Sequence, residues 1–323
     1  MTAALVSGLR AAWRAPSLAL LLLFVNVSTA AILAAPLLRN LETDLQNRGA
    51  ATRMLGGFDH DWWKRWSDVQ SGHEKAFGPE ILGAGFAFRN LDLLLKGDLP
   101  ARLFARRGEK REAGAPPAIL ALGAAYLALH ALLAGGVLAT LRASSGGFAW
   151  RAFAHACGHY AGPMVRVFLL VLAADALVFL VNVPFASWAD ARAHEAVTER
   201  AALAWALGRR AALLVALLGV HLVSGYAKAI VVLEERTSAV LALVSALAFL
   251  VRNAAVAVLH FASIVLLAIL LAAVFVALDG AFSVGGYRTQ IVALLLMQGF
   301  VLLRIGLRLA LTGGQLALLR ERR

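Results

Sequence analysis

The sequence predicts an all-α polytopic membrane protein with about six transmembrane helices, two interfacial helices and a helical outer loop region. The first supporting observation is composition: 61% of the 323 residues are hydrophobic and only 15% are charged. A soluble domain has about 45–50% apolar and roughly 25% charged residues. Because one water-surrounded core cannot bury this surplus, lipid must solvate much of it. The second observation is that apolar runs of more than 20 residues recur along the chain. Each run can cross a hydrocarbon core of ~30 Å at about 1.5 Å per residue.

These runs give the expected transmembrane helices, which are residues 16–38, 117–141, 164–187, 211–232, 254–278 and 288–312. The segment 1–15 is too short and polar to span, so we expect it to lie in the interface before Pro16 opens the first span. The segment 237–253 is a second expected interfacial helix, because Arg252 and Asn253 separate it from the next apolar run. Residues 39–116 form a long polar region outside the membrane.

Residues 1–35 also look like a secretory signal peptide. Arg10 and Arg14 precede the dense apolar run SLALLLLFV, and small residues follow it near VSTAA. Against this interpretation, the segment before the apolar run is long and the run continues to Leu38. Cleavage therefore stays open as an alternative, and it would leave the other helices oriented as before.

Basic residues predict a topology with both termini inside a bacterial inner membrane. The segments placed inside hold 13 Lys and Arg against three acids, and they are residues 1–15, 142–166, 228–253 and 304–323. The short outer loops, residues 188–210 and 279–288, hold five basic residues against four acids. Lys and Arg are enriched in cytoplasmic loops, whereas loops longer than about 60 residues do not count.

Several functional classes lack support in the sequence. The net charge is +12, but the arginines stand singly at the ends of apolar runs, so no basic face remains for nucleic acid. The chain has no GxxxxGK[ST], no GxGxxG in a strand–helix unit, no GxSxG and no complete HExxH. His155, Cys157 and His159 alternate, but helical phasing points Cys157 away and a fourth zinc ligand is missing. We therefore expect no cofactor and no metal.

One strongly polar side chain lies near the centre of five of the six expected spans. These residues are Asn26, His130, Asp175, His221 and Gln298. An ionised aspartate at a helix centre costs about 2.5–3.5 kcal/mol, so Asp175 should be protonated or paired with His130 or His221. Such a pair could relay a proton or line a permeation path. The alternative is that all five are hydrogen-bonding contacts between helices, worth about 0.6 kcal/mol each.

The outer region contains an aromatic motif, GFDHDWWKRW. Asp59 or Asp61 can cap a short helix. Trp62, Trp63 and Trp66 then suggest an anchor at the outer membrane interface, where tryptophan is enriched. The functional alternative is a platform for a lipid head group or a sugar ring.

Four cations lie near the inner ends of the spans: Arg166, Lys228, Arg304 and Arg308. Such a ring could bind the phosphate groups of anionic lipids or an anionic substrate. The alternative is that they only anchor the helices, with side chains that reach toward the head groups.

The motifs FDHDWWKRW, FGPEILG and NLDLLLKGDLP resemble a pattern in an uncharacterised family of bacterial multi-pass membrane proteins, and so do AGGVLATL and FAHACGHY. GYAKAIVVLEERTSAVLALVSALAFLVRN is similar to a wider set of bacterial membrane domains, in which a helix ending in Tyr-Ala-Arg/Lys meets a cytoplasmic amphipathic helix. The resemblance implies six spans with the N-terminus inside. It implies no activity and carries over no site residues.

From these observations we expect a non-enzymatic role in transport or lipid handling, with membrane lipids as partners. Asp175, His130 and His221 would line the interior. One alternative is a scaffold that docks a cytoplasmic protein through residues 142–163 and 237–253. A weaker alternative is an intramembrane enzyme that uses Asp175 and a histidine as its acid–base pair.

Overall fold

The computed structural model describes residues 2–46, 52–53, 59–70, 94–97, 117–143, 148–281 and 287–322. Within these residues the chain is helical and has no strand, which confirms the all-α prediction. The helices are α1 (Thr2–Trp13), α2 (Pro16–Gln46), α4 (His60–Val69), α7 (Pro117–Arg142), α8 (Trp150–His194), α9 (Glu199–Leu233), α10 (Ala239–Arg252), α11 (Ala254–Ala281) and α12 (Tyr287–Arg322). Each expected span lies inside one of these helices.

Five helices are long and apolar enough to cross a membrane, and they are α7, α8, α9, α11 and α12. The pair formed by α1 and the first part of α2 is bent by 72° and makes a sixth if it counts as one span. The break follows from sequence, because Pro16 occupies the first position of α2, where its missing N–H costs nothing. The chain is therefore a multi-pass integral membrane protein.

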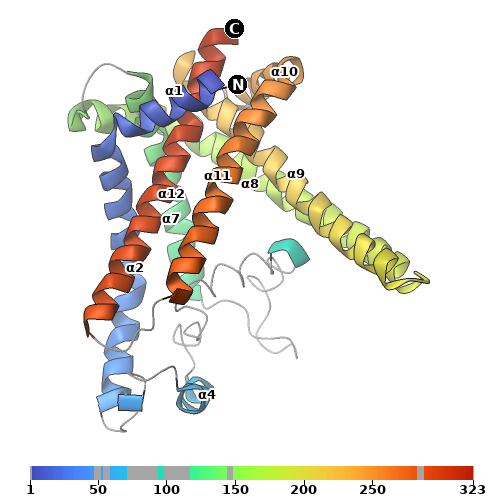
Figure 1. Cartoon of the computed structure of the whole chain (residues 1–323). Helices are drawn as coiled ribbons and strands as arrows, with labels where there is room; N and C mark the ends of the chain where they lie inside the picture. The colour runs from blue at the N-terminus through green and yellow to red at the C-terminus, as the bar shows by residue number, and fades with distance from the viewer. Residues whose placement is uncertain are drawn as a thin grey trace.

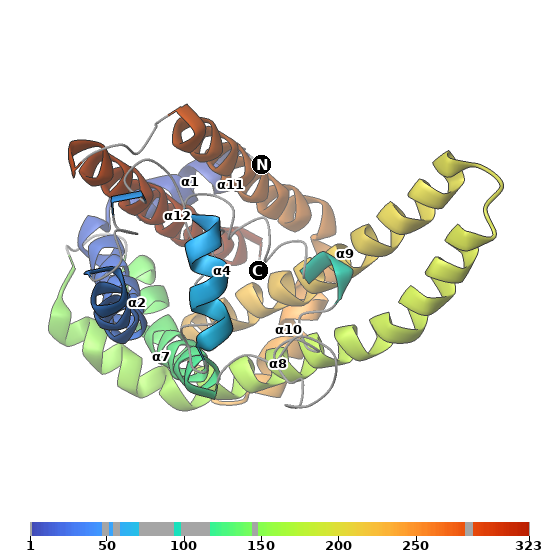
Figure 2. The same ribbon diagram turned by 90° about the horizontal axis from the view of Figure 1, so that it is seen from below.

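The helices divide the molecule into two ends (Figure 1). Both termini, α1 and α10 lie at one end, here called the terminal end, and α4 lies at the other. Helices α2, α7, α11 and α12 run between the ends. Helices α8 and α9 form a long antiparallel hairpin that leaves this bundle and projects sideways, as the view from below also shows (Figure 2).

The hairpin corrects one expectation, because residues 188–210 are helical apart from a short turn and do not form a loop. Arg209 Nη1 lies 3.1 Å from Asp190 Oδ2, and the rings of Trp188 and Trp205 meet edge to face at 5.1 Å. These contacts hold the two helices together beyond their apolar runs. Hydropathy marks where lipid ends, and it does not mark where a helix ends.

A second difference concerns residues 142–163, which we expected as an inner loop and which are helical from Trp150 onward. The side chains of Phe153, Ala156 and Tyr160 follow each other at helical spacing and are buried. A Cβ at Gly135 would lie 2.7 Å from the Tyr160 Cβ. The close packing of α7 on this stretch, which hydropathy alone does not report, keeps it helical.

The core gathers at the terminal end, where α1 lies across α12. A Cβ at Gly8 would lie 2.2 Å from the backbone oxygen of Ala310, so the two helices meet backbone to backbone. Ala4 and Leu18 are 3% and 0% exposed. Cleavage after residue 35 would remove these two side chains from the core.

Arg142 joins three elements at the terminal end. Its Nη1 donates to the backbone oxygen of Val232 at 2.7 Å, and the same atom lies 3.6 Å from Glu235 Oε1. Arg320 Nη2 donates to the backbone oxygen of Arg142 at 2.8 Å. The last turn of α7 is thereby fixed to the end of α9 and to α12.

The turn from α9 to α10 closes with a left-handed residue, Glu235, at φ +52°. The N–H of Arg236 donates to the backbone oxygen of Val231 at 3.1 Å, which is the long hydrogen bond of a Schellman motif. Ser238 then caps α10 by accepting the N–H of Leu241 at 3.4 Å. Of the expected outer region 39–116, the structure describes only the end of α2, α4 and a few further residues.

Candidate functional site

Helices α2, α7, α9 and α12 surround a cavity of about 190 Å³. Its wall is mixed, because it contains both apolar side chains such as Leu22, Leu133 and Leu309 and polar ones. The polar lining residues are Asn26, His130, Lys228, Arg308, Thr312 and Gln315. Two residues expected at midplane and two expected in the inner cationic group therefore share one cavity.

Lys228 of α9 and Arg308 of α12 bring two positive charges to this cavity. No lining residue is acidic, and within the part of the chain that the structure describes neither cation takes part in an ion pair. Lys228 is partly buried and Arg308 is exposed. A charge that is removed from water is costly unless it is paired, which applies to Lys228. An anion placed between the two side chains would supply the missing partner.

Tyr126 and Asn26 join α7 to α2 beside the cavity. The Tyr126 hydroxyl donates to Asn26 Oδ1 at 2.5 Å, and Asn26 Nδ2 donates to the backbone oxygen of Leu22 at 2.7 Å. The amide of Asn26 is thus engaged on both sides. Asn26 therefore forms a hydrogen bond between two helices, which is the second of the two interpretations given for the midplane residues.

His130 lies one turn after Tyr126. Its Nδ1 is 3.0 Å from the backbone oxygen of Tyr126, and the two rings are 4.1 Å apart. In a neutral imidazole that donates from Nδ1, the other nitrogen Nε2 is an acceptor. When protonated, Nε2 becomes a donor suited to an anion.

Gln315 completes the polar wall, and sequence reasoning missed it. Its side chain is 2% exposed, and a Cβ at Gly225 would lie 2.5 Å from its Nε2. The absent side chain of Gly225 lets the amide fit between α9 and α12. The expected last span ends at residue 312, so Gln315 falls in the expected inner tail. The Gly313–Gly314 doublet before it was the available signal for close helix packing.

Asp175 and His221 form a separate pair on the α8–α9 hairpin. His221 Nε2 lies 3.8 Å from Asp175 Oδ2, while Asp175 Oδ1 has no hydrogen-bond partner among the described residues. The His221 side chain is 58% exposed. The five midplane residues are therefore not gathered in one place: His130 lines the cavity, and Gln298 of α12 belongs to neither group.

The four expected inner cations also divide. Arg304 lies one turn from Arg308 on α12, and both side chains are exposed, but only Arg308 lines the cavity. Arg166 Nη1 donates to the backbone oxygen of Thr237 at 3.2 Å, and the residue lines a different pocket between α8 and α10. Equal depth in the membrane thus did not imply a common site.

The tryptophans of α4 are turned toward the protein, which corrects the anchor and platform interpretations. Trp62 and Trp66 share one face as expected, but they are 4% and 5% exposed and pack on Leu37 and Leu41 of α2. Trp66 Nε1 donates to Asp44 Oδ2 at 2.7 Å. Helix α2 continues past its apolar run and offers this surface, so the rings bury against protein. Trp63 packs partly buried at the edge of the same cluster.

Asp59 is the N-cap of α4. Its Oδ1 accepts the N–H of Trp62 at 2.9 Å, and its Oδ2 lies 2.6 Å from Arg53 Nε. The hydrogen bond from Trp62, followed by that from Arg53, lowers the pKa of Asp59 below its usual value. Asp61 lies in the first turn of the helix and is exposed.

The His155 and His159 rings lie parallel on α8, with centroids 6.1 Å apart. Cys157 faces α7 instead, since a Cβ at Gly136 would be 2.4 Å from its Sγ. Among the described residues, no group of three His, Cys, Asp or Glu side chains is placed to hold a metal ion.

Comparisons with protein-family models, curated proteins and solved structures found no match for this chain. Two cations, one imidazole and one buried amide meet in the cavity within the membrane-spanning part of the bundle. Positive charges and N–H donors of this kind suit an anionic partner.

Proposed function

We propose that this chain is a non-enzymatic membrane protein that binds and moves an anionic group, carried by a lipid or by a small solute, through the cavity between α2, α7, α9 and α12. The observation that supports it is the pair Lys228 and Arg308, which face one cavity with no acid among its described lining residues. Hydrogen bonds to charged groups contribute about 1.5–3 kcal/mol each, roughly twice those between neutral groups. Gln315 would add a further donor.

The position of the cavity favours movement over mere anchoring. Lys228 lies near the end of α9 at the terminal end, whereas Asn26 and His130 lie near the middle of their apolar runs. The cavity therefore leads from interfacial depth toward the centre of the bilayer. A head group following these side chains would leave the interface while keeping polar partners.

We further propose that the terminal end is cytoplasmic in a bacterial inner membrane. The excess of Lys and Arg in the short segments of this end supports the orientation. The measurement is labelling with a membrane-impermeant maleimide in a Cys157→Ser background. Gln70→Cys should react in intact spheroplasts, and Glu321→Cys only after permeabilisation. The reverse pattern would refute the orientation.

The binding step is tested by native mass spectrometry of the purified full chain with phosphatidylglycerol. The double variant Lys228→Gln, Arg308→Gln should bind one lipid fewer, with apparent affinity at that site reduced by about tenfold or more. Arg304→Gln is the matched control, because it removes a cation from the same helix one turn away from the cavity. An equal effect of Arg304→Gln would show that only overall charge matters, and the proposal would be wrong.

The movement step is tested in proteoliposomes. Head-group-labelled phosphatidylglycerol and dithionite quenching follow lipid exchange between leaflets, and radiolabelled inorganic phosphate follows solute uptake. Activity in the first assay identifies a lipid and activity in the second a solute, and either should be lost in the Lys228 and Arg308 variant. If the wild-type chain is inactive in both while it still binds phosphatidylglycerol, movement is refuted.

A scaffold role through residues 142–163 and 237–253 stays a prediction. Helix α10 does expose an apolar face that includes Val240, Val244 and Val251. A helix that lies in the membrane interface presents such a face to lipid. The face therefore does not favour a protein partner over the bilayer.

A further inference from the structure

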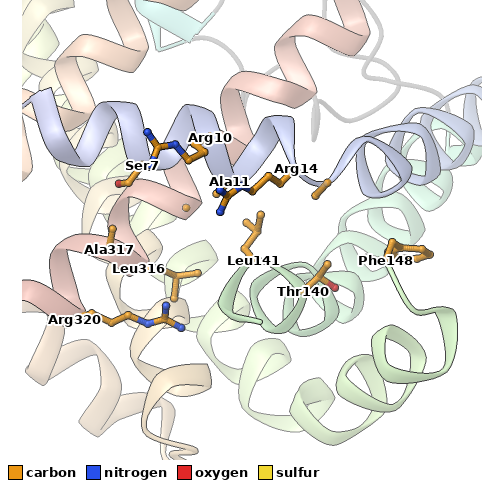
Figure 3. Close-up of a pocket in the computed structure, with 12 residues that line it drawn as sticks. Ser7, Arg10, Ala11, Arg14, Thr140, Leu141, Phe148, Leu316, Ala317 and Arg320 are labelled. Carbon is orange, nitrogen blue, oxygen red and sulfur yellow. The ribbon is translucent and has the colours of Figure 1, made fainter. Parts of the chain in front are cut away.

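A second cationic pocket lies at the terminal end, between α1, α7 and α12 (Figure 3). Its volume is about 230 Å³. Arg10 lies on α1, Arg14 follows directly after it, and Arg320 comes from α12 on the other side (Figure 3). None of these three residues belongs to the cavity of Lys228 and Arg308.

Among the residues that the structure describes, the three guanidinium groups have no counter-charge. Arg10 and Arg14 are one helical turn apart, a spacing at which like charges destabilise a helix. None of the residues that line the pocket is acidic, and no ion pair involves the three arginines in the part of the chain that the structure describes. The hydrogen bond from Arg320 to the Arg142 backbone uses one nitrogen and neutralises no charge. The pocket is therefore prepared for an anion.

Apart from Ser7 and Thr140, the rest of the wall is apolar, and it comes from all three helices and the segment after α7. Leu141, Phe148 and Leu316 lie beside the arginines. Helix α1 is bent by 72° from α2 and runs across the bundle at its terminal end. A ligand with a phosphate and an attached apolar chain matches both parts of this wall. Arginine is the side chain best suited to phosphate, because its planar fork can donate two parallel hydrogen bonds.

We propose that this pocket binds the phosphate of a phospholipid in the leaflet at the terminal end. The chemistry it recognises is a phosphate ester, which a soluble phosphate monoester shares. The pocket is separate from the cavity, since twelve residues of helix between Arg308 and Arg320 span about 18 Å. The inference therefore stands whether or not the cavity moves an anion.

The experiment counts phosphatidylglycerol molecules bound to the full chain by native mass spectrometry. The triple variant Arg10→Gln, Arg14→Gln, Arg320→Gln should lose one bound lipid, and the affinity of that site should fall by at least about tenfold. The charge-matched control is Arg151→Gln, Arg252→Gln, Arg322→Gln. Its residues are exposed and lie outside the pocket, so we expect less than a twofold change.

Further measurements separate the alternatives. The single variant Arg14→Gln, which keeps the α1–α12 contact, should weaken the same site if the triple variant fails to fold. Glycerol 1-phosphate should displace the lipid only at concentrations more than about 100-fold higher, because it lacks acyl chains. Displacement at equal concentration would overturn the lipid assignment. Equal losses in the pocket and control variants would overturn the site itself. The Lys228 and Arg308 variant should keep this lipid, so the two proposals fail independently.

Discussion

The crossing of α1 over α12 depends on Gly8, and Gly8→Ala tests it. The added Cβ would lie 2.2 Å from the backbone oxygen of Ala310 and 3.0 Å from the backbone nitrogen of Gly314. Neither atom can rotate away, because both belong to the backbone of α12. Helix α1 would have to move by about 1 Å, and the packing of Ala4 and Leu18 would be lost in part.

The expected size follows from two opposing effects. Overpacking of this kind costs typically 1–3 kcal/mol. Replacing glycine by alanine inside a helix returns at most about 1 kcal/mol. Gly306→Ala on α12 is the matched control, because a Cβ there meets nothing within 4 Å. The two variants should therefore differ by about 1–3 kcal/mol, with Gly8→Ala the less stable.

Apparent melting temperature in detergent, followed by tryptophan fluorescence at a fixed heating rate, is the assay. Such unfolding is often irreversible, so inactivation half-lives at one temperature should be compared as well. We expect Gly8→Ala to melt several degrees below Gly306→Ala. Equal melting temperatures and half-lives would refute the close crossing of α1 and α12, and with it the geometry of the three-arginine pocket.

Three further predictions concern single residues. Glu235→Gly should raise stability by about 1 kcal/mol in the same assay, because glycine adopts the left-handed conformation at φ +52° without steric cost; a loss would mean that the ion pair to Arg142 matters more. The stabilisation by the Asp59 cap is present in full above the ordinary pKa of 3.8 and is lost as the pH falls through the lower folded pKa, so α4 should loosen in acid. Asp59→Asn should remove this pH dependence, which is followed by tryptophan emission. Asp175→Asn should insert and fold almost normally but abolish any proton dependence of lipid or phosphate movement; a retained dependence would exclude the Asp175–His221 pair as the proton site.

Much of the fold was predictable because lipid imposes a simple pattern. Runs of more than 20 apolar residues must be helices there, since each backbone N–H needs a partner within its own segment. Pro16 and Asn253 marked the breaks beside α1 and α10 correctly. The helical lengths of α8 and α9 were not predictable from hydropathy. Their polar ends are helical through contacts such as that between Trp188 and Trp205, which join residues of different helices.

The site was predictable in part. Counting along each apolar run predicted the depth of Asn26, His130 and Lys228 in the membrane, but depth alone does not determine which side chains meet. Which side chains meet also depends on how each helix is rotated and which neighbour it has. Gly225 and Gln315 decide this for α9 and α12 through a contact between residues 90 positions apart. In the same way, the tryptophans of α4 were expected to face lipid because the surface of α2 that covers them could not be foreseen.

The projecting hairpin has a consequence for the bilayer around it. At about 1.5 Å per residue, the 45 residues of α8 extend for about 68 Å, and its apolar run, residues 164–187, extends for about 36 Å, which exceeds a hydrocarbon thickness of ~30 Å. Leu180 and Val215 are each 67% exposed on its flanks, so acyl chains must fill the space beside it. A helix longer than the membrane adapts by tilting, and a thicker membrane reduces the tilt. Membrane thickness would thus influence the angle at which α9 carries Lys228 into the bundle, so the chain length and temperature of the surrounding lipid would act on the geometry of the cavity.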